Sequence, residues 1–207
     1  SAASDVYKRQ QDISSMLAGE YTAPKAGDTI VDVCGAPGGK SINAALKMSE
    51  QGDCGRVIAR DLSDYKVALI DENIKRLNIT NIQTQVYDAL DCDESLINKA
   101  DIVIADLPCS GLGIIGRKPD IKYNASPEKL QSLVDLQRDI LKVVSRYVKS
   151  GGVLMYSTCT INRAENEDNA DWICKESGFT KDGEYHQLLP ANNSGMDGFF
   201  VARLIKS

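Results

Sequence analysis

The chain has 207 residues, of which 43% are hydrophobic and 26% charged, a composition that supports one well-buried core. The chain has 24 Lys and Arg residues and 29 Asp and Glu residues. The resulting net charge of −5 excludes nucleic-acid binding through bulk charge alone. No apolar run reaches the roughly 18 residues of a membrane helix, and no signal-peptide pattern opens the chain. We therefore expect a cytoplasmic monomer that contacts no membrane.

The cysteine spacing argues against a metal or redox site, and the amino end sets the expected start of the domain. Six cysteines are spread along the chain, and none forms the close CxxC pair of a zinc or redox site, so we expect reduced thiols and no metal. Residues 1–10 show no apolar period and are expected to be a disordered or non-native lead. Residues 11–207 are expected to form a single domain.

Apolar runs and helical periodicities alternate along the chain. The longest helical stripe lies in 127–148, and we expect Gly151 and Gly152 to end that helix. The predicted elements are, in chain order, a strand at 28–33, a helix at 39–48, a strand at 56–59, a helix at 65–77, strands at 82–87 and 101–105, a helix at 127–148, a strand at 153–157, a helix at 163–177 and a strand at 199–205.

This alternation predicts an α/β fold, with a mostly parallel sheet and helices on both faces. Ligands of such sheets bind beyond the carboxyl ends of the strands. The residues of greatest chemical interest follow those ends, so one crevice is expected to collect them.

A glycine-rich turn, Cys34 to Ser41, follows the first predicted strand. It is not a P-loop, because Cys34 occupies the position of the first glycine, and it lacks the G-x-G-x-x-G spacing of dinucleotide binders. Asp61 and Asp88 end the second and third strands, where carboxylates could accept hydrogen bonds from ribose and adenine. The pattern favours a nucleoside ligand without phosphates, such as S-adenosylmethionine. The alternative is a tight structural turn with two solvated acids.

Two cysteines follow the fourth and fifth predicted strands, within the segments 106–111 and 157–160. Those strands should be neighbours in the sheet, so Cys109 and Cys159 should face the same crevice. The alternative is a pair of buried structural cysteines.

Paired thiols suit the methylation of cytosine at C5, which is a poor nucleophile. A thiolate that adds to C6 makes C5 reactive towards an electrophilic methyl group, and a base must then remove the C5 proton. The attacking thiol needs a lowered pKa. Asp106 is placed to stabilise the adduct at N3 and the exocyclic amine.

The chain resembles the cytosine-C5 RNA methyltransferases of the RsmB/Sun/NSUN family. The resemblance implies a Rossmann-like class I methyltransferase fold with a seven-stranded sheet, an S-adenosylmethionine cofactor and a methyltransferase domain at 11–207. The matching segments span nearly the whole chain: 11–15, 32–40, Asp61, Asp88, 106–111, 158–160, 165–167 and 197–200.

The resemblance also implies roles for individual residues. Cys159 would be the nucleophile, Cys109 would assist product release, and Asp106 would belong to both the catalytic and the cofactor sites. The cofactor contacts that carry over are Cys34, Gly35, Ala36, Pro37, Gly38, Gly39, Lys40, Asp61, Asp88 and Asp106.

The stretch 114–123 is most similar to the 16S rRNA branch of the family. Its Arg117, Lys118, Lys122 and Tyr123 are suited to phosphate contacts and base stacking, which predicts RNA, here 16S rRNA, as the partner. The alternative is a solvated loop. The RNA-binding domain that precedes this region in that branch is expected to be absent, so the chain should bind cofactor but bind RNA poorly alone.

Two competing functions remain. A small-molecule methyltransferase would explain the cofactor turn but not the paired thiols. An inactive RNA-binding module with a methyltransferase-like fold would require both cysteines to be incidental.

Overall fold

The computed structural model describes residues 13–52, 55–190 and 197–207, so the predicted lead at 1–10 lies outside the described residues. The strands are β1 (Thr29–Asp32), β2 (Arg56–Asp61), β3 (Ile82–Val86), β4 (Ala100–Asp106), β5 (Val148–Thr158), β6 (Phe179–Lys181), β7 (His186–Leu188) and β8 (Phe199–Lys206). The helices are α1 (Ile13–Thr22), α2 (Gly39–Glu50), α3 (Asp64–Leu77), α4 (Ile121–Asn124), α5 (Pro127–Val144) and α6 (Glu167–Ser177), with single 3₁₀ turns at Glu94–Leu96 and Leu112–Ile114.

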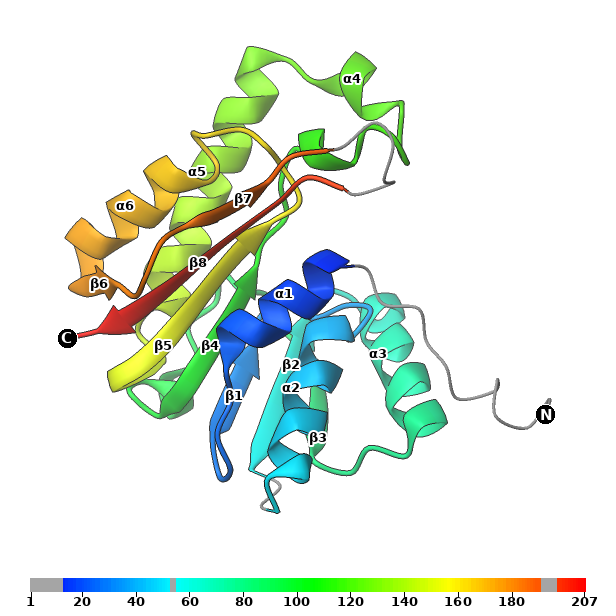
Figure 1. Cartoon of the computed structure of the whole chain (residues 1–207), viewed down its shortest axis with the longest axis vertical. Coiled ribbons are helices and arrows are strands. Elements are labelled where there is room, and N and C mark those ends of the chain that lie inside the picture. The colour runs from blue at the N-terminus through cyan, green and yellow to red at the C-terminus, as the bar shows by residue number, and fades with distance from the viewer. Residues whose placement is uncertain (1–12, 53–54, 191–196) are drawn as a thin grey trace.

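The strands form one sheet in the order β3-β2-β1-β4-β5-β8-β6 (Figure 1). The first five strands pair in parallel, and β8 runs antiparallel to β5. β6 and β7 both pair with β8, one at each end of that strand, which adds an eighth strand to the seven that were predicted. The predicted Rossmann-like α/β architecture, mostly parallel with helices on both faces, is confirmed.

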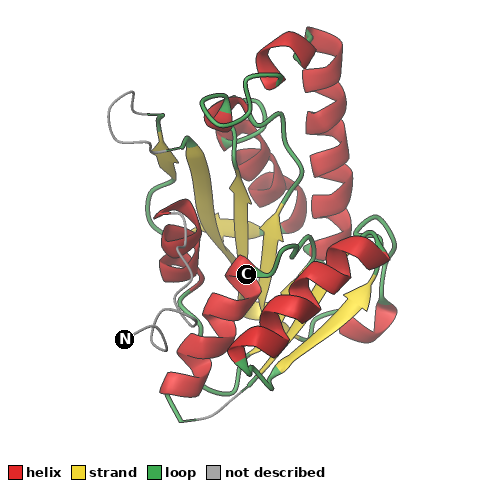
Figure 2. Ribbon diagram, turned by 90° about the vertical axis from the view of Figure 1, so that its right-hand side faces the viewer, coloured by secondary structure: helices red, strands yellow, loops and turns green. Residues whose placement is uncertain are grey.

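Both faces of the sheet are covered (Figure 2). One hydrophobic cluster joins the sheet to α1 and α2 and includes Ile102 and Ile104 of β4; the other joins it to α5 and α6 and includes Val103 and Ala105. Because alternate side chains of β4 are buried on opposite faces, the strand has to be apolar along its length, as its sequence is.

The predicted end of the long helix was wrong. α5 ends at Val144, and Val148 already belongs to β5, where it pairs with Ala100 of β4. The strand register shifts between that pair and Ile102–Val153, and Gly151 takes a φ of 72° within the intervening bulge. The glycines therefore permit an irregularity in a strand rather than ending a helix.

The helix α1 was not predicted, and it packs against α2 and the carboxyl-terminal strand. Ala18 is fully buried in the core cluster on that face. Arg203 of β8 donates hydrogen bonds from Nη1 to the carbonyl oxygens of Tyr21 and Thr22, at 2.8 and 2.9 Å. This side chain satisfies carbonyl groups that the last turn of a helix leaves without intrahelical partners.

None of the helices in the described ranges is long and apolar enough to cross a membrane.

Candidate active site

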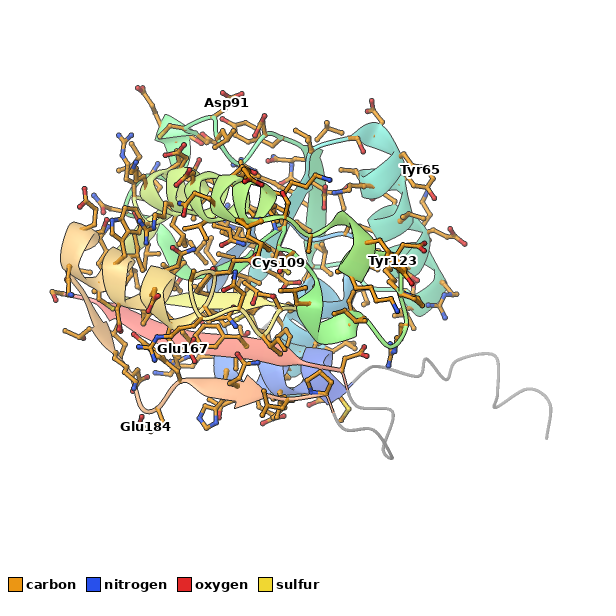
Figure 3. All side chains as sticks on the ribbon, turned by 90° about the horizontal axis from the view of Figure 1, so that it is seen from above. Tyr65, Asp91, Cys109, Tyr123, Glu167 and Glu184 are labelled. Atoms are coloured by element: carbon orange, nitrogen blue, oxygen red, sulfur yellow. The ribbon has the colours of Figure 1, made fainter. Side chains whose placement is uncertain are left out.

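The loops that follow β1, β4 and β5 meet at one edge of the sheet. Seen from above, Cys109 lies near the middle of the molecule, whereas Tyr123 and Tyr65 lie towards its periphery (Figure 3). β4 and β5 are direct neighbours, as predicted, with Asp106 paired to Ser157 at their carboxyl ends. This register places the segments containing Cys109 and Cys159 side by side.

The two thiols are in contact. Cys109 Sγ lies 3.1 Å from Cys159 Sγ, and the backbone N–H of Cys159 donates a hydrogen bond to Cys109 Sγ at 3.2 Å. Both side chains are only partly exposed. The expectation that the neighbouring strands bring these two cysteines together is therefore confirmed, whereas their chemical roles stay predictions.

The contact separates the acidities of the two thiols. The hydrogen bond from Cys109 lowers the pKa of Cys159, and nearby Lys40 lowers it further against the opposing effects of burial and Asp106. The same hydrogen bond, together with burial, raises the pKa of Cys109. Of the two thiols, Cys159 is therefore the one that ionises more readily, and Cys109 is the one that keeps its proton longer.

A buried carboxylate fixes the two cysteine loops relative to each other. Glu165 Oε2 accepts hydrogen bonds from the backbone N–H of Ser110 at 2.8 Å and from the amide of Gln137 at 3.0 Å. Its Oε1 accepts from Asn162 Nδ2 at 2.9 Å, and Gln137 also donates to the carbonyl of Pro108. Glu165 is 0% exposed. Three donors from different segments thus converge on one carboxylate behind the thiols.

A second carboxylate links the cysteine loops to the glycine-rich turn. Asp106 Oδ2 lies 2.5 Å from Lys40 Nζ, and Asp106 Oδ1 accepts a hydrogen bond from Ser157 at 2.7 Å. Burial alone would lower the pKa of Lys40, but its contact with Asp106 outweighs burial and raises it. Lys40 is therefore a permanent cation between the turn and the cysteine pair.

The glycine-rich turn folds over the end of β2. The N–H of Gly35 donates to the carbonyl of Arg60 at 2.7 Å, and the N–H of Ala36 donates to Asp61 Oδ2 at 3.0 Å. Gly38 precedes α2 with a φ of 100°, a backbone conformation that residues other than glycine rarely adopt. The carboxylate of Asp61 therefore holds the turn through the hydrogen bond from Ala36, and it also pairs with Lys66 at 3.0 Å.

A cavity of about 100 Å³ lies against this turn. Its walls include Cys34, Lys40 and Asp106, as predicted, whereas neither Asp61 nor Asp88 lines it. Asp88 Oδ1 instead accepts a hydrogen bond from the N–H of Leu90 at 2.9 Å. The lining residues are Asp32, Cys34, Gly35, Ala36, Pro37, Gly39, Lys40 and Asp106.

Asp32 was missed as a site residue, although it opens the matching segment 32–40; in the structure it is the last residue of β1. Its Oδ2 accepts a hydrogen bond from Ser41, but its buried Oδ1 has no hydrogen-bonding partner among the residues that the structure describes. Burial raises the pKa of Asp32 to about 7, against the opposing hydrogen bond from Ser41. A buried acceptor without a donor, facing a cavity, fits a ligand that brings its own N–H or O–H group.

The basic stretch lies on the other side of Cys109. Arg117 pairs with Asp197 at 3.0 Å, and Lys122 Nζ lies 4.8 Å from the centre of the Tyr123 ring. Tyr123 is 77% exposed. Arg117 and Lys118 thus line a cavity together with Cys109, while Lys122 and Tyr123 belong to α4, and Tyr123 lies towards the periphery of the molecule (Figure 3).

The described ranges contain no group of three or more His, Cys, Asp or Glu that could hold a metal ion.

Gln137 was also missed by the sequence analysis, although one signal for it exists. It is a polar residue between Val134 and Ile140 on the apolar stripe of α5, and it is 0% exposed. A polar residue at a core position of a helix indicates a buried hydrogen-bond network.

Comparison with known proteins agrees with this geometry. Residues 20–205 match the family model described as 16S rRNA methyltransferase RsmB/F. The probable ribosomal RNA small subunit methyltransferase B of Bacillus subtilis (strain 168) is 38% identical over 215 residues, which cover 95% of this chain and 47% of that protein. The ribosomal RNA small subunit methyltransferase F of Escherichia coli O157:H7 is 33% identical, over 95% of this chain and 44% of that protein. The chain thus spans about half the length of these relatives.

Solved structures with the same fold are also similar in sequence. The crystal structure of PH0851 has a TM-score of 0.89 and 31% identity, covering 100% of this chain and 49% of that one. The structure of NSun6 from Pyrococcus horikoshii with SFG has a TM-score of 0.85 and 28% identity, covering 99% of this chain and 54% of that one. The chain belongs to the family of 16S rRNA methyltransferases RsmB/F.

Proposed function

We propose that this chain carries the catalytic centre of an S-adenosylmethionine-dependent methyltransferase that methylates C5 of a cytosine in RNA, with 16S rRNA as the substrate. Membership in an rRNA methyltransferase family supports the reaction class and the substrate. The observation that carries the cytosine-C5 chemistry is the contact of 3.1 Å between Cys109 Sγ and Cys159 Sγ, beside the Lys40–Asp106 pair.

The residues of the glycine-rich turn fit this cofactor. The unpartnered Oδ1 of Asp32 suits the ammonium group of a methionine moiety, and the exposed backbone of the turn permits close approach. The cavity of about 100 Å³ is smaller than the roughly 300–1,000 Å³ usual for whole ligands. It therefore holds one part of the cofactor, while Asp61 and Asp88 lie outside it at the ends of β2 and β3, on the side proposed for ribose and adenine. When bound, the cofactor supplies an electrophilic methyl group.

Cys159 begins the reaction as a thiolate. Its sulfur forms a bond to C6 of the cytosine, and the electrons of the C5–C6 double bond make C5 nucleophilic. Asp106 accepts hydrogen bonds from Lys40 and Ser157, and its oxygens retain lone pairs for the exocyclic amine. Lys40 stabilises the negative charge that moves into the ring.

Product release reverses the first bond. Once C5 carries the methyl group, its proton must leave so that the double bond can re-form and the bond between Cys159 and C6 can break. Cys109 lies in contact with Cys159 Sγ, which is an uncharged thioether in the adduct. Once the thiol of Cys109 has released its own proton to water, its thiolate can accept the C5 proton. Removal of Cys109 should therefore stop the reaction at the covalent adduct.

The test is a trapping experiment. A Cys109→Ala variant is incubated with S-adenosylmethionine and transcribed 16S rRNA at about pH 8.5, near the usual pKa of a thiol, so that Cys159 ionises even without its neighbour. We expect a protein–RNA complex that survives a denaturing gel and contains the transferred methyl group. The Cys109→Ala, Cys159→Ala double variant and RNA transcribed without cytidine are the matched controls.

The proposal fails if no adduct forms while filter binding shows that the variant holds the RNA. It also fails if the adduct persists in the double variant, because the attacking sulfur would then lie elsewhere. An adduct with cytidine-free RNA would exclude cytosine as the target.

A further inference from the structure

A cavity of about 410 Å³ opens beside Cys109, between the basic stretch and the first turns of α5. Its walls carry three cationic side chains and two leucines of α5. The residues that matter for its chemistry are Cys109, Arg117, Lys118, Lys129, Leu130 and Leu133.

This cavity is separate from the place where the target base must react. It shares no lining residue with the cavity of the glycine-rich turn, and neither Cys159, Lys40 nor Asp106 lines it. A cytosine under attack has to contact Cys159, so it does not lie here. Cys109 stands between the reacting position and the cavity, which places the cavity within reach of a group attached to the target nucleotide.

The lining suits a nucleotide. Leu130 and Leu133 offer an apolar face for a base, and Arg117, Lys118 and Lys129 can neutralise a phosphodiester. Asp120 also lines the cavity, and Asp197 pairs with Arg117, so the three cations meet two carboxylates and keep a surplus of one positive charge. A volume of about 410 Å³ lies within the range of small-ligand pockets.

The walls are held in place by the active site itself. The N–H of Gly113 donates to the carbonyl of Cys159 at 3.1 Å, and the N–H of Gly198 donates to the carbonyl of Gly113 at 2.7 Å. Arg117, which lines the cavity, pairs with Asp197, the residue that precedes Gly198. A ligand in this cavity would thus be positioned relative to Cys159 without rearrangement of the loop.

We infer that this cavity binds the nucleotide next to the target cytidine, with its base against the leucines and its phosphate between the cations. The inference rests on the proposed function and adds a subsite to it. It makes the substrate a single strand in which two consecutive nucleotides enter separate pockets on either side of Cys109.

The test measures binding apart from catalysis. The full chain, saturated with S-adenosylhomocysteine, is titrated by NMR with cytidine monophosphate, with the dinucleotide CpC, and with CpC in which one base has been removed. We expect CpC to bind at least about tenfold more tightly than the mononucleotide, because one more base and one more phosphate are held. Removal of the adjoining base should cancel most of that gain.

Two variants change exposed residues that line the cavity. Ala125→Trp fills it, and Lys129→Glu reverses one cation; both should reduce the gain to less than about twofold. Lys75→Glu, at the end of α3 and so towards the opposite edge of the sheet, has the same charge change and should keep the full gain. Circular dichroism confirms that each variant is folded.

Equal affinities for the mononucleotide and CpC would overturn the inference, as would an undiminished gain in both cavity variants. Methylation of CpC is followed in parallel samples that contain S-adenosylmethionine. Methylation without the affinity gain rejects the cavity and leaves the proposed function standing, whereas the gain without methylation supports the cavity and counts against the proposed function.

Discussion

The carboxylate of Glu165 accepts a hydrogen bond from the backbone N–H of Ser110 at 2.8 Å, across 55 residues of sequence. The bond joins the residue that follows Cys109 to the segment that follows Cys159. Substitution of Glu165 by Ala removes the acceptor of three donors, of which that of Gln137 is buried and those of Ser110 and Asn162 are half-buried, at a cost of about 1 kcal/mol or more for each.

We therefore expect Glu165→Ala to lower the free energy of unfolding in urea by about 3 kcal/mol or more. Glu167→Ala, two residues along and at the start of α6, is the matched control and should lose much less. Equal losses in the two variants would show that the carboxylate does not hold the cysteine loops together.

The lowered pKa of Cys159 predicts its reactivity towards iodoacetamide. Mass spectrometry across a range of about pH 6 to 9 should find Cys159 alkylated at lower pH than Cys109, because only the thiolate reacts. In Cys109→Ala the alkylation profile of Cys159 should move to higher pH, since the donor that stabilises its thiolate is gone. Cys174→Ala is the control and should leave the profile in place; a profile unchanged in both variants contradicts the assignment.

Asp32 predicts a pH-dependent term in stability. Its pKa rises from 3.8 in the unfolded chain to about 7 in the native protein, so between these values the native state binds more protons and loses stability as pH rises. An amide in place of the carboxyl group cannot ionise, so the stability of Asp32→Asn relative to the parent chain should increase from about pH 4 to about pH 7 and level off above. Urea unfolding at closely spaced pH values measures this difference, and a difference independent of pH would refute the prediction.

Two glycines of one loop should respond differently to alanine. A Cβ on Gly113 would lie 2.5 Å from the carbonyl oxygen of Gly198 and 2.8 Å from that of Cys159, and both are backbone atoms. Gly113→Ala should therefore cost about 1–3 kcal/mol in unfolding free energy and disturb adduct formation. Gly116 meets nothing within 4 Å, so Gly116→Ala should change neither quantity. A tolerated Gly113→Ala would show that the two loops are not tightly packed.

The placement of the active-site edge was predictable because strand ends are marked in the sequence. An apolar run followed by a polar residue ends β2 at Asp61 and β4 at Asp106, and alternation with helices fixes the strands as parallel. From these features alone the neighbourhood of Cys109 and Cys159 followed. What the sequence could not provide is the 3.1 Å contact, which depends on loop conformation.

The errors have local causes. Val148 continues the apolar spacing of α5 but pairs with Ala100 in the sheet, and pattern alone does not separate the two states. β6 and β7 are three residues each and too short for a visible period. The Glu165 network joins positions 28 and 55 residues apart, so no local signature indicates it.

The bond from Arg203 to the last turn of α1 makes the two ends of the described chain one cooperative unit. Fraying of the end of α1 would remove both carbonyl acceptors of Arg203 Nη1 on β8, and β8 pairs with β5, β6 and β7. Amide hydrogens of α1 are thus expected to exchange with deuterium almost as slowly as those of β8, although short terminal helices usually exchange first. Arg203→Met should accelerate exchange in α1 while the interior strands stay protected.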